Sequence, residues 1–284
     1  MLKLVECPRD AMQGLTEFIP TQTKIDYINH LLTVGFDTID FGSFVSHRAI
    51  PQMKDTASVL AGLNLEKTSS KLLAIVPNQR GARDACKFEE IHYLGYPFSI
   101  SETFQKRNAN ATIDQSLKRV EKIHNLCVKH NKEMLVYISM AFGNPYEDPW
   151  SVDIAAYWSR RLHNELGIKT LALSDTIGVS NHDNITELFE GLINELPNVE
   201  FGAHLHSTPD SVEEKVNAAY QAGCRRFDGA IRGFGGCPMA KDDLTGNMPT
   251  EQMKLYFDNH KIGTHLDEEA FSEAMNMALT VFPH

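Results

Sequence analysis

Eight short apolar runs, separated by longer amphipathic segments, constrain the fold of this chain more than any other feature. The runs span residues 3–7, 38–41, 71–76, 93–100, 134–140, 170–173, 199–204 and 226–231, and each ends in polar or glycine residues. Short apolar runs of this kind are typical of buried strands in parallel sheets, which are usually joined by helices. The alternation therefore predicts an α/β fold made of eight strand–helix units.

Several of the segments between these runs have the periodicity of amphipathic helices. In the clearest, residues 112–127, apolar side chains recur every three or four positions, and Thr112 and Gln115 match a capping box. Similar patterns cover residues 23–34, 153–166, 184–196 and 210–222. Gly35, Gly167 and Gly223 each follow such a segment, at the place where a glycine commonly ends a helix.

A single (β/α)8 TIM barrel spanning residues 1–284 accounts best for this pattern, because no Ser/Pro-rich linker divides the chain. Residues 266–284 would form an additional C-terminal helix on the outside of the barrel. A doubly wound parallel sheet is the alternative, since alternation alone does not decide whether a sheet closes. The count of eight and the lack of a glycine-rich turn after the first run favour the barrel.

Composition limits the partners and the compartment. The chain is 42% hydrophobic and 23% charged, as soluble globular proteins are, and its net charge of −10 argues against nucleic acid and anionic membranes. A local basic pocket for an anionic ligand remains compatible with that charge. Five scattered cysteines without a CxxC pair indicate a reducing environment. Without a signal-like N-terminus or an apolar run of ~18 residues, a cytoplasmic location is expected.

In a TIM barrel the functional groups follow the carboxyl ends of the strands. His204 and His206 end the seventh run, and the two-residue period of a strand turns both imidazoles to the same side. Two neutral imidazoles close together suit a divalent metal, although a hydrogen-bonded histidine pair is the simpler alternative. Asp10, which follows Arg9 at the end of the first run, could complete such a site with oxygen ligands suited to Mg²⁺ or Mn²⁺.

Other strand ends and one loop supply further reactive groups. Asp40 and Asp175 end two more runs, where a carboxylate could transfer protons or cap the following helix. Residues 233–247 contain Gly233, Gly235 and Gly236 before a cysteine, which indicates backbone that bends sharply or closely approaches another segment. Cys237 itself could be an inert buried thiol, a zinc ligand or a general acid, because a free thiol with a pKa near ~8.5 is mostly protonated at neutral pH.

With these residues in place, the whole chain resembles the hydroxymethylglutaryl-CoA lyases of the DRE-type TIM-barrel metallolyase family. The resemblance is carried by the segments 5–10 (VECPRD), 43–46 (SFVS), 51–53 (PQM), 145–147 (PYE), 174–179 (SDTIGV), 204–206 (HLH) and 235–238 (GGCP). The last of these is the signature of the lyases, and the related synthases are not expected to carry it.

The resemblance implies a divalent-metal-dependent carbon–carbon lyase that cleaves 3-hydroxy-3-methylglutaryl-CoA to acetyl-CoA and acetoacetate without an organic cofactor. The implied ligands of Mg²⁺ or Mn²⁺ are Asp10, His204, His206 and Asn247. The implied catalytic residues are Arg9, which would stabilise an enolate, Cys237 on a mobile loop, Asp175, and Asp10 or His204 as the base. The implied substrate contacts are Arg9, Gln13, Asp40, Ser43 and Tyr146.

Departures from the family pattern fall in the acyl and CoA pocket. Residues 11–15 read AMQGL where the family commonly has GLQNE, Asp40 stands where glutamate is usual, and the loop from Cys237 to Asn247 is one residue longer. The substrate is therefore less closely specified than the reaction class. The alternatives are a related aldolase or Claisen-type enzyme acting on another 3-hydroxyacyl-CoA or 2-oxo acid, or a non-catalytic binding barrel. By analogy with the family, a homodimer and a role in leucine degradation are also expected.

Overall fold

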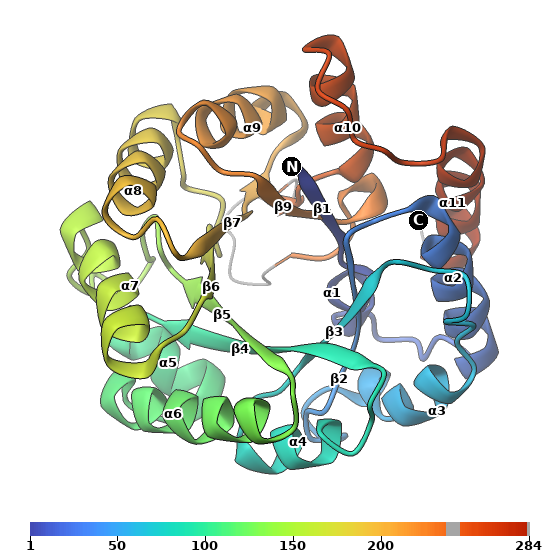
Figure 1. Cartoon of the computed structure of the whole chain (residues 1–284), viewed down its shortest axis with the longest axis horizontal. Coiled ribbons are helices and arrows are strands. Elements are labelled where there is room, and N and C mark those ends of the chain that lie inside the picture. Colours follow the sequence, from blue (N-terminus) through green and yellow to red (C-terminus); the bar gives the residue numbers. More distant parts are fainter. Residues whose placement is uncertain (237–244, 283–284) are drawn as a thin grey trace.

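Eight parallel strands close into a barrel in the computed structural model, which describes residues 1–236 and 245–282. The strands lie around the barrel in chain order, and β9 pairs with both β7 and β1 to close the sheet (Figure 1). They are β1 (Lys3–Glu6), β2 (Thr38–Ser43), β3 (Lys71–Ile75), β4 (Ile91–Ser99), β5 (Glu133–Ser139), β6 (Thr170–Ser174), β7 (Glu200–His204) and β9 (Arg226–Gly229). The predicted (β/α)8 barrel is confirmed, and each strand overlaps one of the eight apolar runs.

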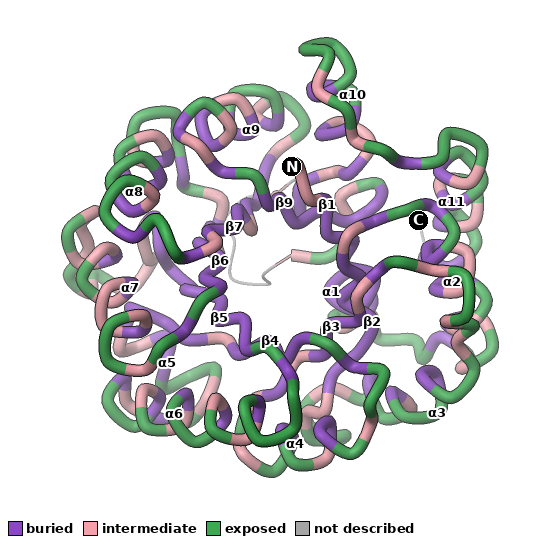
Figure 2. The backbone as a smooth tube through the Cα atoms, in the orientation of Figure 1, coloured by how far each residue is buried: buried purple, intermediate pink, exposed green. Residues whose placement is uncertain are grey.

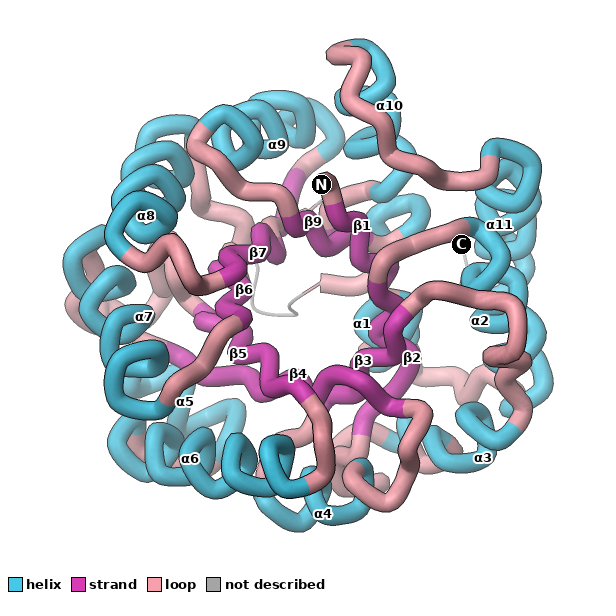
Figure 3. The backbone as a smooth tube through the Cα atoms, viewed as in Figure 1, coloured by secondary structure: helices cyan, strands magenta, loops and turns pink. Residues whose placement is uncertain are grey.

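Helices form a ring around this barrel (Figure 3). The short α1 (Pro8–Gln13) lies inside this ring, against β2. The other helices of the described ranges are α2 (Thr21–Val34), α3 (Thr56–Ala61), α4 (Gln79–Ala85), α5 (Glu102–Ala109), α6 (Ile113–Lys129), α7 (Val152–Leu166), α8 (His182–Glu195), α9 (Val212–Gln221), α10 (Thr250–Asn259) and α11 (Glu268–Val281). Short 3-10 turns lie at Pro51–Met53, Pro209–Ser211 and Ile231–Gly233. The expected C-terminal helix is present as α11, which contacts α2 on the outside of the barrel.

The local signals that predicted helix ends have their expected geometry. Thr112 and Gln115 form both hydrogen bonds of the capping box at the start of α6. Gly35 and Gly167 adopt the left-handed conformation at the ends of α2 and α7, and Gly223, just after α9, has a φ of 101°. These glycines end their helices because left-handed backbone strains other residues.

The core has two parts, one between the strands and the helices and one inside the barrel. Figure 2 shows the strands buried along most of their length, whereas the outer faces of the helices are exposed. The interior cluster consists of Leu73, Tyr93, Leu135, Tyr137 and Ala172. No helix of the described ranges is long and apolar enough to cross a bilayer. The four cysteines in those ranges are free and buried.

A short antiparallel ribbon at the carboxyl end of the barrel joins β8 (His206–Ser207) to β10 (Gly246–Asn247), with Asn247 opposite His206. No pattern in the sequence predicts this ribbon, because two-residue strands have no periodicity. It brings the end of the glycine-rich loop beside the histidine strand. Cys237 lies outside the described residues.

The described glycines of this loop do what their clustering indicated. Gly233, Gly235 and Gly236 have φ values of 67°, 84° and 124°. A Cβ on Gly235 would lie 2.8 Å from the backbone oxygen of Asp10 and 2.9 Å from the Cα of Ala11. The backbone therefore both turns sharply and passes close to α1, which only glycine allows.

Candidate active site

A cavity of about 420 Å³ opens at the carboxyl end of the barrel. Its polar lining brings together residues that lie at five different strand ends. They include Arg9, Asp10, Gln13, Ser43, Ser139, Ser174, Thr176, His204 and His206. Most of the residues predicted to bind metal or substrate thus share one enclosed space.

Arg9 is fixed by acidic and amide side chains on two elements. Its Nε lies 3.2 and 3.0 Å from the two carboxylate oxygens of Asp40, and its Nη2 also donates to Asp40. Its Nη1 donates to Asp10 at 2.7 Å and to Gln13 at 2.9 Å. Burial alone would lower the pKa of Arg9, but Asp40 and Asp10 raise it above its ordinary value. The guanidinium is a permanent, immobile positive charge.

Asp40 does not line the cavity but is buried within β2, where its carboxylate binds Arg9. Burial, partly offset by Arg9, raises the pKa of Asp40 to about 6. The side chain orients the guanidinium of Arg9, and its predicted contact with substrate stays a prediction.

Asp10 is held by three side chains at this end of the barrel. It accepts hydrogen bonds from Arg9, from Gln13 Nε2 at 2.8 Å and from Asn247 Nδ2 at 2.8 Å. Burial would raise the pKa of Asp10, but Arg9, His204 and the Asn247 hydrogen bond outweigh it and lower the pKa to about 2. Asp10 therefore presents a carboxylate at any physiological pH.

His204 and His206 meet Asp10 in a group suited to a cation. One ligand atom of each residue lies within 4.8 Å of the others. His206 is 4% exposed, and neither of its ring nitrogens has a hydrogen-bond partner among the described residues. Burial and the neighbouring His204 lower the pKa of His206 to about 4, so the ring is neutral. Buried polar atoms normally have partners, and a divalent cation fits this donor set.

Asn247, the fourth predicted ligand, is placed next to this group by the β8–β10 ribbon. Its Nδ2 donates to Asp10 and, at 2.8 Å, to the backbone oxygen of Phe234. The Nδ2 group of the amide is thus engaged in two hydrogen bonds, which leaves Oδ1 as the atom that could bind a cation.

Two other predicted residues lie apart from the cavity lining. Asp175 accepts from the backbone of Val179 at 2.8 Å and of Ser180 at 3.0 Å, and pairs with Lys215 Nζ at 2.9 Å. Its chain neighbours Ser174 and Thr176 line the cavity instead. Tyr146 lies beyond the lining, where it stacks on Phe104, with 6.5 Å between ring centroids, and interacts with the Arg107 guanidinium.

Sequence reasoning missed two buried residues that support the histidines. Lys215, on α9, donates from Nζ to the backbone oxygen of His206 at 2.7 Å. Asp228, on β9, places Oδ2 3.2 Å from His204 Nδ1. The alternation of β9 offered a signal, because Arg226 and Asp228 are charged residues two apart in a buried strand and so face the barrel interior together. Lys215 has no comparable signal on its amphipathic helix.

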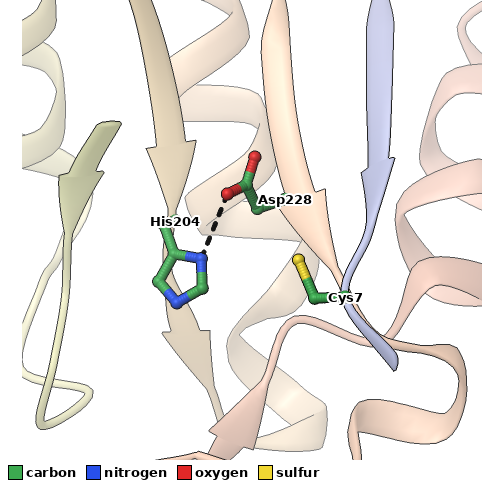
Figure 4. A group of neighbouring side chains, drawn as sticks. All are labelled: Cys7, His204 and Asp228. Carbon is green, nitrogen blue, oxygen red and sulfur yellow. Dashed lines mark hydrogen bonds and ion pairs between the residues drawn. The ribbon is translucent and has the colours of Figure 1, made fainter. Parts of the chain in front are cut away.

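Cys7 lies beside His204 and Asp228, and the three side chains point toward one another from neighbouring strands (Figure 4). Their ligand atoms also fall within 4.8 Å of one another. Burial and nearby carboxylates raise the pKa of the Cys7 thiol well above its ordinary value, however, and Asp228 already accepts from His204. The group of Asp10, His204 and His206 is therefore the better cation site.

A second hollow, of about 550 Å³, continues from the cavity across α4, α5 and α6. Four of its lining residues are basic, namely Arg80, Arg107, Arg119 and Lys122. Cavity and hollow share lining residues at Val45, Ala49, Pro77, Asn108 and Ala109. We refer to this hollow as the basic groove. It provides a local positive surface on a chain whose net charge is −10.

Comparison with known proteins agrees with this geometry. The HMGL-like family model matches residues 3–278. The hydroxymethylglutaryl-CoA lyase of Bacillus subtilis is 33% identical over 94% of this chain and 88% of that protein. A 3-hydroxy-3-isohexenylglutaryl-CoA/hydroxymethylglutaryl-CoA lyase of Pseudomonas aeruginosa is 31% identical over 96% of this chain and 90% of its own. An HMG-CoA lyase of Acinetobacter baumannii, solved with coenzyme A and 3-methylmalate, is 30% identical with a TM-score of 0.89, covering 99% of this chain and 91% of that one.

Proposed function

The chain belongs to the HMGL-like family, and from this premise we propose that it cleaves 3-hydroxy-3-methylglutaryl-CoA to acetyl-CoA and acetoacetate. One observation of the structure supports this reaction above others. The group of Asp10, His204 and His206 lies in the same cavity as the fixed guanidinium of Arg9. Cleavage next to a tertiary alcohol needs both kinds of group, one to take the hydroxyl proton and one to stabilise the departing enolate.

The first step is removal of the proton from the 3-hydroxyl group of the substrate. Asp10 and His204 both line the cavity and are both candidates for the base. A divalent cation, which we propose to be Mg²⁺ or Mn²⁺ held by Asp10, His204, His206 and Asn247, would lower the pKa of the hydroxyl and fix its orientation. Gln13, which holds Asp10 through a 2.8 Å hydrogen bond, keeps the carboxylate in place.

As the hydroxyl proton leaves, the electron pair of the O–H bond forms the C=O double bond of acetoacetate, and the C2–C3 bond breaks. Its electron pair passes to the acetyl-CoA fragment, whose negative charge develops on the thioester oxygen. Arg9 is charged, buried and held by Asp40, Asp10 and Gln13, so it can stabilise that oxygen without reorganising. Asp40 acts here through Arg9.

The enolate carbon must then receive a proton to give acetyl-CoA. We assign this step to the thiol of Cys237, on the family resemblance of residues 235–238. The proton taken from the hydroxyl group would return to the thiolate after product release, so that protons balance over the cycle. Ser43, in the cavity lining, and Tyr146 and Asp175, which lie outside it, remain predicted contributors to substrate binding and catalysis.

The basic groove supports a CoA thioester as the substrate. Acyl-CoA carries a diphosphate and a 3′-phosphate far from its thioester, and arginine is well suited to bind phosphate groups. Because the groove is continuous with the cavity, the nucleotide could lie along α4–α6 while the acyl group reaches Arg9.

The proposal is tested by measuring acetoacetate release from 3-hydroxy-3-methylglutaryl-CoA with Mg²⁺ or Mn²⁺. Release that EDTA abolishes and added cation restores is the expected result. Full activity of a metal-free Cys237→Ala protein would contradict the mechanism.

The isohexenyl substrate named for the Pseudomonas relative justifies a second candidate, a lyase for longer 3-alkyl chains. Assays across 3-hydroxy-3-alkylglutaryl thioesters separate the two.

The remaining expectations stay predictions. A single domain over residues 1–284, a cytoplasmic location, a homodimer and a role in leucine degradation follow from composition or from the family resemblance. Sedimentation of the purified protein tests the oligomeric state directly. Release of CoA from acetyl-CoA and a 2-oxo acid, without lyase activity, would favour a Claisen-type enzyme of the same family instead.

A further inference from the structure

We propose that Asp228 is a positioning residue that fixes the tautomer of His204, keeping the proton on Nδ1 and leaving Nε2 free to bind a cation. The inference rests on the proposed metal-dependent function, but its central measurement is made on the metal-free protein. Asp228 itself does not line the cavity and would not contact substrate. With Nδ1 protonated and Nε2 on the cation, His204 would have no nitrogen left to take the hydroxyl proton, so this arrangement favours Asp10 of the two candidate bases.

The geometry defines which nitrogen carries the proton. Asp228 is 2% exposed on β9, and its Oδ2 lies 3.2 Å from His204 Nδ1 (Figure 4). A carboxylate can only accept, so Nδ1 of the neutral ring must be the donor. The lone pair of the ring is then on Nε2. Carboxylates that bind metal-ligating histidines in this way both orient the ring and set its tautomer.

An aromatic neighbour, Tyr137, also restricts the orientation of the His204 ring. Tyr137 packs against His204 edge to face, with centroids 5.2 Å apart and planes at 75°. Packing of this kind restricts rotation of the ring but does not distinguish the two nitrogens. Asp228 supplies that distinction, which makes it the residue that decides where the proton resides.

Arg226 explains why a carboxylate can persist in this buried position. Arg226 and Asp228 are two residues apart on β9 and face the same side of the sheet. Burial alone would lower the pKa of Arg226, but Asp228 is the largest of the influences that raise it. Asp228 Oδ1 and the three guanidinium nitrogens have no hydrogen-bond partner among the described residues. Arg226 Nη1 lies 3.5 Å from Asp37 Oδ1 and 3.6 Å from Glu200 Oε2, so the guanidinium is shared with these carboxylates and acts on Asp228 over a longer range.

This arrangement predicts an unusual order among variants at position 228. In Asp228→Asn, the amide oxygen should turn toward Arg226, which can only donate, so the amide NH₂ group faces His204. The ring would then accept through Nδ1 and carry its proton on Nε2, the nitrogen needed for the cation. An Asp→Asn change beside a catalytic histidine produces the wrong tautomer in the same way in serine proteases. Asp228→Ala removes the partner without forcing either tautomer.

The first measurement is the affinity for Mn²⁺, by calorimetry or electron paramagnetic resonance. Asp228→Asn should weaken binding by about 10–100-fold, as loss of such support does in other metal sites, and Asp228→Ala should weaken it less. A purely structural role predicts the reverse, because asparagine preserves the shape of the side chain. Asp55→Asn, which breaks the partly buried ion pair with Lys24 on the outside of the barrel, is the matched control and should leave affinity unchanged.

The second measurement is the ¹⁵N spectrum of the His204 ring in the metal-free protein, at a pH where the ring is neutral. The wild type should show a protonated Nδ1, and Asp228→Asn a protonated Nε2. A protonated Nε2 in the wild type, or an Asn variant that binds Mn²⁺ better than the Ala variant, would overturn the proposal. Neither readout depends on turnover, so loss of lyase activity in every protein would contradict the proposed function without affecting this inference.

Discussion

Gly235 is the residue whose identity the structure explains most directly. Its φ of 84° and the close approach of Asp10 and Ala11 exclude a side chain. We expect Gly235→Ala to lower the free energy of unfolding by about 1–3 kcal/mol, measured by urea denaturation, because it combines backbone strain with a steric clash. It should also weaken Mn²⁺ binding, since the new methyl group would lie 2.8 Å from Asn247 Nδ2.

Gly191 provides the control for that substitution. It is exposed on α8, and a Cβ there would meet nothing within 4 Å. Gly191→Ala should stabilise the protein by about 0.5–1 kcal/mol, because alanine loses less conformational entropy in a helix. Equal effects of the two substitutions would show that strain at Gly235 is not significant.

Single residues also show how far sequence reasoning reached at the site. Asp10, His204 and His206 were predictable, because strand periodicity and the rule that barrel sites follow strand ends determine their side and their position. Asp175 satisfied the same rule, yet its carboxylate binds Lys215 and the following turn instead of lining the cavity. The direction of the Asp175 side chain depends on Lys215, forty residues further along the chain. The local periodicity of the sequence carries no information about such a distant partner.

At the scale of elements, Lys215 ties α9 to β8 and to the turn that follows β6. It is buried, pairs with Asp175 at 2.9 Å and holds the backbone of His206. Lys215→Met leaves the Asp175 charge buried and uncompensated, so we expect a loss of about 3–5 kcal/mol in the free energy of unfolding, measured by denaturant titration.

The double variant Lys215→Met/Asp175→Asn removes both charges and should recover part of that stability. If the single variant lost less than about 1 kcal/mol, the ion pair would not be a significant link between these elements. Mn²⁺ affinity should remain reduced in both proteins, because neither restores the donor to His206.

Glu6 makes a second link between elements, joining β1 to both ends of the glycine-rich segment. Its carboxyl accepts from the backbone of Ile231 at 2.8 Å and from Thr250 Oγ1 at 2.6 Å. Burial raises the pKa of Glu6 to about 8, so the folded protein keeps it protonated at neutral pH. The unfolded chain releases this proton near pH ~4.3, and therefore binds fewer protons than the folded state between those two values.

Stability should consequently fall as pH rises from about 4.5 toward 8, by a few kcal/mol at most, since one pKa unit corresponds to ~1.4 kcal/mol. Glu6→Gln keeps an acceptor for Ile231 and cannot ionise, so its stability relative to wild type should increase across that pH range. Thermal denaturation at pH 5 and pH 8 measures the difference. A difference that does not change with pH would contradict the raised pKa.

Elements differ in how well the sequence predicts them. The strands and the long helices were recognisable because each has enough residues to show a period. The β8–β10 ribbon was not, although it places Asn247 opposite His206. The ribbon is a tertiary contact between two segments about forty residues apart, which the barrel brings together. No local sequence pattern can therefore predict it.

At the scale of the whole molecule, the distribution of charge matters more than its sum. The chain carries ten more acidic than basic residues, yet Arg80, Arg107, Arg119 and Lys122 converge on the basic groove. A net negative surface repels an anionic substrate, so a local positive region is needed to bind and orient it. The composition was compatible with such a pocket, but the location of the pocket depends on how α4, α5 and α6 are arranged around the barrel.

If this groove binds the nucleotide of CoA, neutralising it should affect binding and spare the chemistry. We expect Arg80→Gln/Lys122→Gln to raise KM for 3-hydroxy-3-methylglutaryl-CoA by roughly tenfold with kcat almost unchanged, because uniform binding energy is lost. The corresponding pantetheine thioester lacks the phosphates, so its KM should not change. Arg160→Gln/Arg161→Gln on α7, whose side chains pair with Glu195 and Glu165, is the matched control. An equal rise in KM for both thioesters would contradict nucleotide binding in the groove, because the substitutions would then have disturbed the acyl cavity itself.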